Sequence, residues 1–394
     1  MRILIIHNFY KQYGGEDKAV EDQIRLLKSA GHHVYLYSKD NKALNLKNTI
    51  RTFLEAYYSK STVREIGTIV DQFKPHIAHV HNIYPVISPS VYQTLSDKKV
   101  PIVQTVHNYR FICPNGLMFR KGRPCACCLE KGSYYYCGLY RCYRGSFLQS
   151  FWYADIISKA YKKGLFNKIS RFIALNGFVK NKMIEKGFNE EAIEIIPHFV
   201  NINSYEITGN TRKMDYVLYI GRLSAEKGVM TLLKAMKILG NINLKIMGDG
   251  GLKHEIAEYI KANNMKNVEL LGFKTGREKD YIISQAKAIV LPSECYETFG
   301  LAVVEGFSLG TAAIVSKGGA LEYIIKEGVN GLCFQPGNPN DLAEKIKLIA
   351  NNERLLEYMS QNAFKTYKEY YSPEIHYKRL MNLYERVITE NMER

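Results

Sequence analysis

The chain has 394 residues, of which 46% are hydrophobic and 23% are charged, and its formal net charge is +16. This composition is typical of a globular protein with a large core, and the length favours two or three domains. The longest apolar runs, such as RILII and AIVL, are too short to cross a membrane, and the start MRILIIHN does not resemble a secretory signal. We therefore expect a cytoplasmic protein.

The positive charge is concentrated in the first half of the chain. Residues 1–198 contain 29 Lys and Arg against 15 Asp and Glu, a balance of +14, whereas residues 199–394 contain 25 against 23, a balance of +2. A basic half predicts an anionic partner, which could be a membrane surface, a phosphorylated lipid or nucleic acid. A basic surface with no partner is the other interpretation. Since no nucleic-acid-binding motif is present, we expect no nucleic acid.

Short apolar segments alternate with helical patterns along the first half. A helix is expected from Glu16 to Ala30, and strands are expected at 2–7, 33–38, 76–81, 101–107 and 171–175. This alternation predicts a parallel sheet that is covered by helices on both faces.

The same pattern restarts after the polar stretch INSYEITGNTRKMD, with strands expected at 216–223, 243–250, 268–273 and 288–293. The sequence therefore predicts two doubly wound, Rossmann-like α/β domains, 1–200 and 201–372. Ligands of such folds bind where the strands end, so we expect a central cleft between the domains. Apolar residues near helical spacing predict a terminal helix in 373–394.

Two features of the first half point to a ligand. Gly14 and Gly15 precede a helix whose first turn contains Glu16 and Asp17, and such glycines can expose backbone N–H groups to a phosphate. A Gly-Gly turn is also common without a ligand. No G-x-G-x-x-G follows the first strand, which argues against a nicotinamide cofactor. His107 follows the strand 101–106, where it could bind a ligand or serve the structure.

In the second half, GRLSAEKG places Arg222 and Lys227 on a loop between a strand and a helix. Two cations there could clamp a diphosphate, or they could be solvated charges. MGDGG closes the next strand, and Gly248 would allow a ligand to approach the backbone closely.

The stretch ETFGLAVVEG places Glu297 and Glu305 eight residues apart. Two helical turns separate such positions, so the carboxyl groups would not share a proton. The spacing instead favours contacts at two ends of one extended ligand. Phe299, Gly300 and Leu301 open the helix, and their backbone N–H groups would be available to that ligand.

YGGED, GRLSAEKG, MGDGG and ETFGLAVVEG, in this order, resemble glycosyltransferase family 4, which has the GT-B fold. The resemblance covers nearly the whole chain. The segment HNYRFICPNGLMFRKGRPC also resembles a subgroup associated with capsular polysaccharide, exopolysaccharide and lipopolysaccharide assembly. The resemblance implies a retaining, metal-independent enzyme. It would transfer a hexose from a UDP- or GDP-sugar to a saccharide on polyprenyl diphosphate.

The resemblance also implies roles for single residues. Arg222 and Lys227 would neutralise the diphosphate, Glu297 would bind hydroxyl groups of the donor sugar, and Glu305 would bind the ribose. His107 would lie beside the sugar, and the terminal helix would return to the N-terminal domain. Further donor contacts are implied for Gly14, Gly15, Gly221, Gly248, Phe273, Lys274, Phe299, Gly300 and Leu301.

Six of the eight cysteines lie in residues 113–142. The spacing C-x11-C-x2-C-x13-C of Cys113, Cys125, Cys128 and Cys142 is similar to that of tetrathiolate zinc sites, so a structural zinc is one interpretation. Cys127 and Cys137 blur the choice of ligands. Reduced thiols and disulfides are the alternatives.

The position of this loop after His107 suggests that it shapes the acceptor side, with Arg110, Asn115 and Arg144 as candidate contacts. The segment FWYADIISKAYKKGLFNKI, 151–169, mixes aromatic residues with lysines. It could lie at the inner face of an anionic cytoplasmic membrane or pack on the domain core. Other functions considered are a nucleotide-sugar epimerase or hydrolase, a sugar-nucleotide sensor and a nucleic-acid-binding protein.

Overall fold

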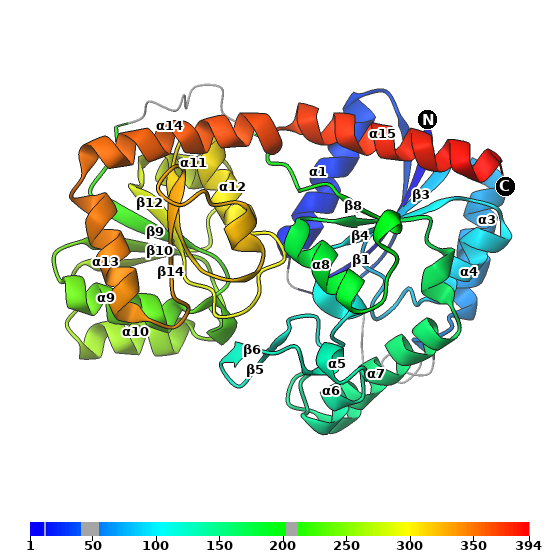
Figure 1. Ribbon diagram of the computed structural model, residues 1–394, viewed down its shortest axis with the longest axis horizontal. Helices are drawn as coiled ribbons and strands as arrows, with labels where there is room; N and C mark the ends of the chain where they lie inside the picture. The colour runs from blue at the N-terminus through cyan, green and yellow to red at the C-terminus, as the bar shows by residue number, and fades with distance from the viewer. Residues whose placement is uncertain (12, 41–54, 202–211, 394) are drawn as a thin grey trace. The chain divides into compact units, whose positions relative to one another are not determined.

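The computed structural model describes every residue except 12, 41–54, 202–211 and 394. Its internal contacts divide the chain into two units (Figure 1). The first unit comprises Met1–Met118, Ala126–His198 and Pro373–Arg394, and the second comprises Phe119–Cys125 and Phe199–Ser372. Both ends of the described chain therefore belong to the first unit.

A sheet of six parallel strands forms the centre of the first unit. Its spatial order is β2-β1-β3-β4-β7-β8. The strands are β1 (Arg2–Phe9), β2 (His33–Asp40), β3 (Ile77–Val80), β4 (Ile102–Val106), β7 (Arg171–Ala174) and β8 (Ile193–Ile195). All four residues from Ile3 to Ile6 are fully buried. Because successive side chains point to opposite faces, this run shows that β1 is covered on both sides.

The helices of the first unit are α1 (Gly15–Ser29), α3 (Lys60–Phe73), α4 (Ser90–Asp97), α5 (Cys127–Glu130), α6 (Tyr136–Leu139), α7 (Phe147–Lys162), α8 (Gly177–Glu185) and α15 (Pro373–Met392). Polar residues start several of them. The side chains of Ser59, Ser146 and Asn176 accept hydrogen bonds from the first turns of α3, α7 and α8.

The last helix, α15, packs on α1 and the first sheet (Figure 1). Leu380, Leu383 and Tyr384 of α15 share one buried cluster with Ile3, Ile5 and Val20. The structure thus places residues 373–393 in the unit that begins the chain.

The second unit has its own sheet of six parallel strands, in the order β11-β10-β9-β12-β13-β14. These strands are β9 (Tyr216–Ile220), β10 (Asn243–Met247), β11 (Val268–Gly272), β12 (Ala288–Leu291), β13 (Ala312–Ser316) and β14 (Gly331–Phe334). The short antiparallel hairpin β5 (Phe119–Arg120) and β6 (Arg123–Pro124) is grouped with this unit.

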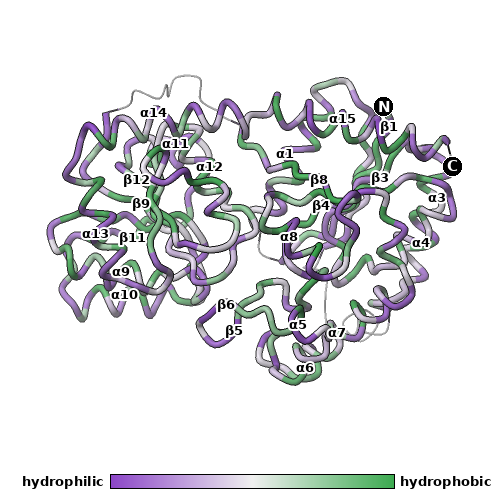
Figure 2. Tube along the Cα trace, in the orientation of Figure 1, coloured by the Kyte–Doolittle hydropathy of each residue, from purple (hydrophilic) through white to green (hydrophobic). Residues whose placement is uncertain are grey.

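Helices cover both faces of the second sheet. They are α9 (Val229–Leu239), α10 (Lys253–Ala262), α11 (Gly276–Gln285), α12 (Leu301–Ser308), α13 (Pro339–Ala350) and α14 (Glu353–Tyr370). Val217 and Tyr219 of β9 pack with α9, α10 and α13, whereas Tyr216 and Leu218 pack with Ile283 of α11 and Leu309 beyond α12. The strands of both units are correspondingly hydrophobic in Figure 2.

The predicted α/β fold class is confirmed, and every expected strand is present. Five further described strands were not predicted: β8, β13 and β14 of the two parallel sheets, and β5 and β6 of the hairpin. The sequence pattern missed β13 because α12, which precedes it, is buried from Val303 to Ser308 and lacks the polar face of a surface helix. None of the described helices combines the length and the apolar character that a membrane span requires.

Candidate functional site

The loops after β9 and β12 bring Lys227 and Glu297 together in the second unit. Lys227 ends the short 3-10 turn Ala225–Lys227, and Glu297 lies between β12 and α12. The Nζ atom of Lys227 is 2.6 Å from Oε1 of Glu297. Ser293 donates a further hydrogen bond to the same oxygen. The structure thus joins two residues that lie 70 positions apart in the sequence.

Both members of this pair are charged at neutral pH. Burial by itself would raise the pKa of Glu297, but the ammonium group of Lys227 and the hydrogen bonds from Lys227 and Ser293 hold that pKa below its usual value. Burial would likewise lower the pKa of Lys227, but the carboxylate of Glu297 raises it. A fixed, partly desolvated cation at a strand end can stabilise an anion.

Arg222, the other predicted clamp residue, pairs with a different carboxylate. Its guanidinium group is 2.8 Å from Glu226, four residues further along the same loop, and about half of the side chain is exposed. The two predicted clamp residues therefore differ in the structure, because Lys227 is enclosed whereas Arg222 is open to solvent.

The glycine-containing turn MGDGG, which follows β10, packs against the loop that follows β9. Gly248 has a φ of 152°, and a Cβ atom at this position would lie 1.9 Å from the carbonyl oxygen of Gly221. Nearby backbone hydrogen bonds join Gly221 to Met247 and Leu223 to Asp249. Gly221 and Gly248 thus hold the ends of β9 and β10 in close contact.

Glu305 lies on α12, where it is buried and faces α11. Its Oε1 atom accepts a hydrogen bond of 2.6 Å from Lys279. Glu297 and Glu305 therefore each have their own lysine, in agreement with two separate contacts rather than a shared-proton pair. Gly300 starts α12 with a φ of 101°, and a Cβ there would lie 2.6 Å from Leu321.

The other predicted donor contacts of the second unit differ in exposure. Leu301 is the first residue of α12, and Phe299 is buried against the ring of Tyr371 at 5.9 Å. Phe273, which follows β11, is exposed, and Lys274 is 2.6 Å from Glu278.

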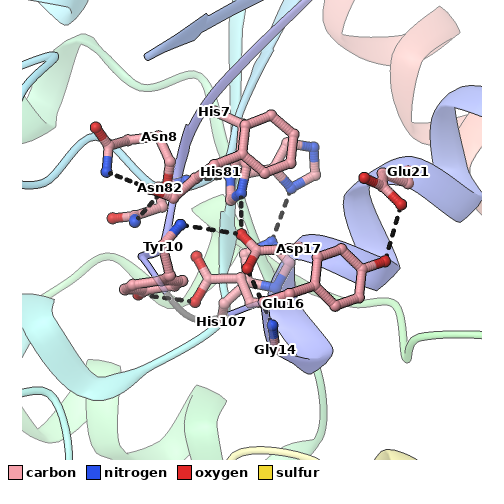
Figure 3. Close-up of polar contacts among 12 residues, drawn as sticks. His7, Asn8, Tyr10, Gly14, Glu16, Asp17, Glu21, His81, Asn82 and His107 are labelled. Carbon is pink, nitrogen blue, oxygen red and sulfur yellow. Dashed lines mark hydrogen bonds and ion pairs between the residues drawn. The ribbon is translucent and has the colours of Figure 1, made fainter. Parts of the chain in front are cut away.

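In the first unit, three His-Asn dipeptides meet where neighbouring strands end, and Figure 3 shows His7, Asn8, His81, Asn82 and His107 of this group. They are His7–Asn8 of β1, His81–Asn82 after β3 and His107–Asn108 after β4. His81 and His107 are hydrogen-bonded through Nδ1 and Nε2 at 2.8 Å, and the amide of Asn82 donates to the backbone of Asn8. The repeated dipeptide was a sequence signal that pattern analysis of His107 alone missed.

Asp17 connects the Gly14–Gly15 loop to the three His-Asn dipeptides through hydrogen bonds. Its carboxylate is 2.9 Å from Nε2 of His7 and accepts a hydrogen bond from the backbone of Gly14 (Figure 3). Gly14 is the N-cap of α1, and Gly15 is the first residue of that helix. The buried carboxylate of Asp17, on α1, thus holds the backbone of the preceding loop in place.

Glu16 occupies the neighbouring position and has different partners. The hydroxyl group of Tyr10 and the amide of Asn108 donate to its Oε2 atom, at 3.1 and 3.3 Å. Burial raises the pKa of Glu16, although His7 and Arg110 oppose this shift. Together with His81, His107 and Arg110, it lines a cavity of about 20 Å³, which is enough for roughly one water molecule.

His107 itself is buried, and its ring stacks on that of His198 at 5.0 Å. Burial lowers its pKa well below the usual value, and neighbouring histidines add to the shift, so the ring is neutral at pH 7. Its Nδ1 atom has no hydrogen-bond partner within the described part of the chain. A neutral imidazole here can donate or accept a hydrogen bond.

The candidate acceptor contacts differ in their surroundings. Arg110 lines the same cavity, with its guanidinium group over the rings of Tyr84 and Tyr153. Asn115 is buried and accepts from Cys113 and from the backbone of Leu117. Arg144 is exposed beside the ring of Tyr143.

The structure does not assemble the predicted zinc ligands. Cys113 interacts most strongly with Cys128, Cys137 interacts most strongly with Cys142, and the two pairs also act on each other, whereas none of these interactions involves Cys125. Across the described ranges, which include all of 113–142, no three His, Cys, Asp or Glu side chains are arranged to hold a metal ion. Cys128 is buried in the helical turn of α5 whereas Cys125 is only partly buried, a difference that the C-x2-C spacing alone could not reveal.

Comparisons with known proteins agree with this arrangement. The family model "Glycosyltransferase Family 4" matches residues 13–204, and "Glycosyl transferases group 1" matches residues 203–366. An uncharacterised glycosyltransferase of Methanocaldococcus jannaschii is 26% identical over 92% of both chains. A 42.6 kDa protein in the cps region of Klebsiella pneumoniae is 23% identical over 93% of this chain and all of that protein.

Solved structures share the fold over nearly the full length. The sucrose-phosphate synthase of Thermosynechococcus elongatus has a TM-score of 0.72 and 17% identity, with 99% of each chain covered. HepE of Anabaena, solved with UDP and glucose, has a TM-score of 0.67 and 15% identity, with 97% of this chain and 98% of HepE covered. With two parallel six-stranded units and consecutive matches to both family models, the chain belongs to the family 4 glycosyltransferases and has the GT-B fold.

Proposed function

We propose that this glycosyltransferase moves a hexose, with retention of anomeric configuration and without a metal ion, from a nucleotide-diphosphate sugar to a saccharide carried on polyprenyl diphosphate. We further propose that it works at the inner face of the cytoplasmic membrane in the synthesis of a bacterial surface polysaccharide. The observation that carries the donor part is the enclosed pair of Lys227 and Glu297 at the strand ends of the second unit.

The donor proposal assigns separate tasks to the two carboxylates. Glu297 would accept hydrogen bonds from hydroxyl groups of the sugar, and Glu305, with Lys279 beside it, would contact the ribose. A nucleotide donor is supported by HepE, whose solved complexes contain UDP, UDP-glucose or UDP and glucose. The contacts predicted for His107, Gly14 and Gly15 are part of the same proposal.

The chemistry follows from where charge develops. Breaking the bond between sugar and phosphate places negative charge on the diphosphate and positive charge on the sugar ring. Lys227, with Arg222 on the more exposed side, would stabilise the first, and the carboxylate of Glu297 would stabilise the second. As the resemblance to retaining family members implies, we propose attack on the same face with the leaving phosphate as base.

The acceptor proposal rests on the first unit. Residues 1–198 carry a balance of +14, which suits an acceptor that bears a diphosphate. Arg110 and Glu16 beside the small cavity offer a cation and a hydrogen-bonding carboxyl group for its saccharide part. The relative in the Klebsiella cps region supports a role in surface polysaccharide synthesis.

Two measurements test this function. Thermal unfolding with a panel of UDP-, GDP- and ADP-sugars, in the presence of a chelator, should identify one donor that raises the melting temperature. Mass spectrometry should then detect transfer to a synthetic prenyl-diphosphate-linked sugar, and NMR should find the donor's anomeric configuration in the product. Inversion, or a strict requirement for a divalent metal, would contradict the proposal.

A nucleotide-sugar epimerase or hydrolase is the second candidate. It would consume the donor when no acceptor is present, whereas a transferase should form its sugar product only with the acceptor. Comparing the products with and without the prenyl-linked sugar separates the two functions.

A further inference from the structure

The first unit exposes a group of large apolar side chains at the junction of α6 and α7. We call this group the α6–α7 face; it consists of Leu139, Tyr140, Phe147, Leu148 and Phe151, with 63, 41, 49, 72 and 45% of their surface exposed. All five fall within 13 consecutive positions. Isolated apolar residues on a surface need no explanation, but a group of this kind indicates an interaction site.

The structure holds these side chains on one surface. Phe147, Leu148 and Phe151 are spaced by one, three and four positions, so they lie on the same side of α7. The rings of Phe147 and Phe151 stack with centroids 6.0 Å apart, and Phe151 lies 5.2 Å from the ring of Tyr135. A Cβ added to Gly138 would approach Phe151 at 3.2 Å, which shows how closely α6 and α7 pack (Figure 1).

The rest of α7 packs largely into the core. Tyr153, Ala154, Ile156 and Ile157 are buried, and so are Leu165 and Phe166 beyond the helix. Within 151–169, the apolar residues after Trp152 therefore belong to the core, apart from the half-exposed ring of Tyr161. The exposed apolar surface instead begins before this segment, at Leu139.

Charge around the face favours an anionic partner. Residues 130–162 contain five cations, Lys131, Arg141, Arg144, Lys159 and Lys162, all exposed, against two acids, Glu130 and Asp155. Asp155 is paired with Lys159 at 2.6 Å, so Lys131, Arg141, Arg144 and Lys162 carry the positive charge around the face. Two copies of this face would bring like charges together, which opposes self-association through it.

We propose that the α6–α7 face docks on the surface of an anionic phospholipid bilayer. Leu148 and Phe151 would enter the boundary between headgroups and acyl chains, while Arg141, Arg144 and Lys162 would remain among the phosphates. The arrangement of an apolar tip with flanking cations matches the two layers of a membrane interface. This inference deepens the proposed function, since it gives the surface by which the enzyme would reach a lipid-borne acceptor.

Vesicle co-sedimentation of the full chain tests the proposal without donor or acceptor. Wild-type protein should pellet with vesicles that contain phosphatidylglycerol and bind pure phosphatidylcholine vesicles much less. Leu148→Glu should weaken binding at least tenfold, whereas Leu348→Glu, which changes an exposed leucine on α13 of the second unit, should bind as the wild type does. Trp152, the only tryptophan of the chain, adjoins Phe151, so its fluorescence should respond to anionic vesicles.

Several results would overturn the proposal. The proposal fails if wild-type protein does not bind anionic vesicles, or if Leu148→Glu binds them as well as the wild type does. It also fails if Leu148→Glu and Leu348→Glu lose vesicle binding equally, or if the protein forms an oligomer without lipid that Leu148→Glu disrupts. Matching circular dichroism spectra and melting temperatures would establish that both variants are folded. Transfer to a water-soluble acceptor should be unaffected by Leu148→Glu. Vesicle binding without any transfer would leave this inference intact and reject the proposed function.

Discussion

At the scale of single residues, Lys227 is the point where donor binding and chemistry would meet. Its ammonium group is held by Glu297 at 2.6 Å, and Ser293 donates to the same carboxylate. In the proposed mechanism Lys227 matters most when the diphosphate leaves, because the negative charge on the phosphate then reaches its maximum.

Lys227→Ala should lower kcat about 10²–10³-fold, with a smaller change in donor Kd. Lys253→Ala is a matched control, because Lys253 is an exposed lysine of the same unit, 3.7 Å from Asp249. Transfer assays give kcat, and calorimetric titration gives the donor Kd. A variant that retains wild-type turnover would remove Lys227 from the mechanism.

Glu305→Gln should act on binding instead. The change removes the charge that faces Lys279 and the proposed ribose contact, so donor Kd should rise roughly tenfold or more while kcat changes little. Glu278→Gln alters a more exposed glutamate of α11, which is paired with Lys274, and should leave Kd unchanged. Equal effects of the two changes would contradict the assignment of Glu305.

At the scale of elements, the site depends on loops that are packed against one another. Gly248 allows the turn after β10 to touch the backbone of Gly221 after β9, and Gly300 allows the start of α12 to approach the side chain of Leu321. Both contacts lie in loops at the same strand ends as Lys227 and Glu297.

Gly248→Ala should therefore destabilise the second unit by about 2 kcal/mol or more, because the added methyl would meet the Gly221 carbonyl and φ is unfavourable. Gly251→Ala, three residues later in the same turn, is the control, since a Cβ there has no neighbour within 4 Å. Denaturant unfolding of both variants measures the difference. Similar stabilities would show that the turn can relax around the methyl group.

The sequence predicted these elements unevenly. The strand run RILII was predicted from its continuous apolar residues, which the fold buries on both faces. Glu297 and Glu305 were predicted to make separate contacts, and each has its own lysine, although Glu297 lies in the loop before α12 and not on the helix. Their lysine partners were not predicted as such, since Lys227 and Lys279 lie 70 and 26 residues away. Such pairs depend on which strands become neighbours, and spacing along the chain carries no information about that.

At the scale of the whole molecule, the first unit contains a group of buried neutral histidines drawn from distant parts of the chain. Burial lowers the pKa of His79 and His198 to about 3 and that of His376 to about 4, and lowers those of His81 and His107 well below the usual value. His376 of α15 contacts the carbonyl of Pro197, and Tyr384 contacts His79. The histidines thus join α15 to the sheet.

The stability of the first unit should fall in acid. In the unfolded chain these histidines take up protons below about pH 6.5, whereas in the folded unit they stay neutral to a lower pH. Their contribution to the free energy of unfolding is therefore complete above about pH 6.5 and is lost progressively below it. Denaturant titrations at pH 7.5, 6.0 and 5.0, followed by Trp152 fluorescence, report on this unit. His79→Gln should flatten the pH dependence, but His254→Gln, at an exposed position of the second unit, should not. A pH-independent midpoint would contradict the explanation.

The sequence by itself determined the fold class, most strands and the family, because alternating apolar segments and short glycine-containing motifs are local properties. Only the tertiary structure decided that Lys227 contacts Glu297, that three His-Asn dipeptides meet, which residues of α15 pack on the first sheet, and that the described residues of 113–142 do not form the predicted ligand set. The physical reason is that these contacts join segments far apart in the chain. Strand order and helix packing set their geometry, and neither is encoded in the spacing of residues along the sequence.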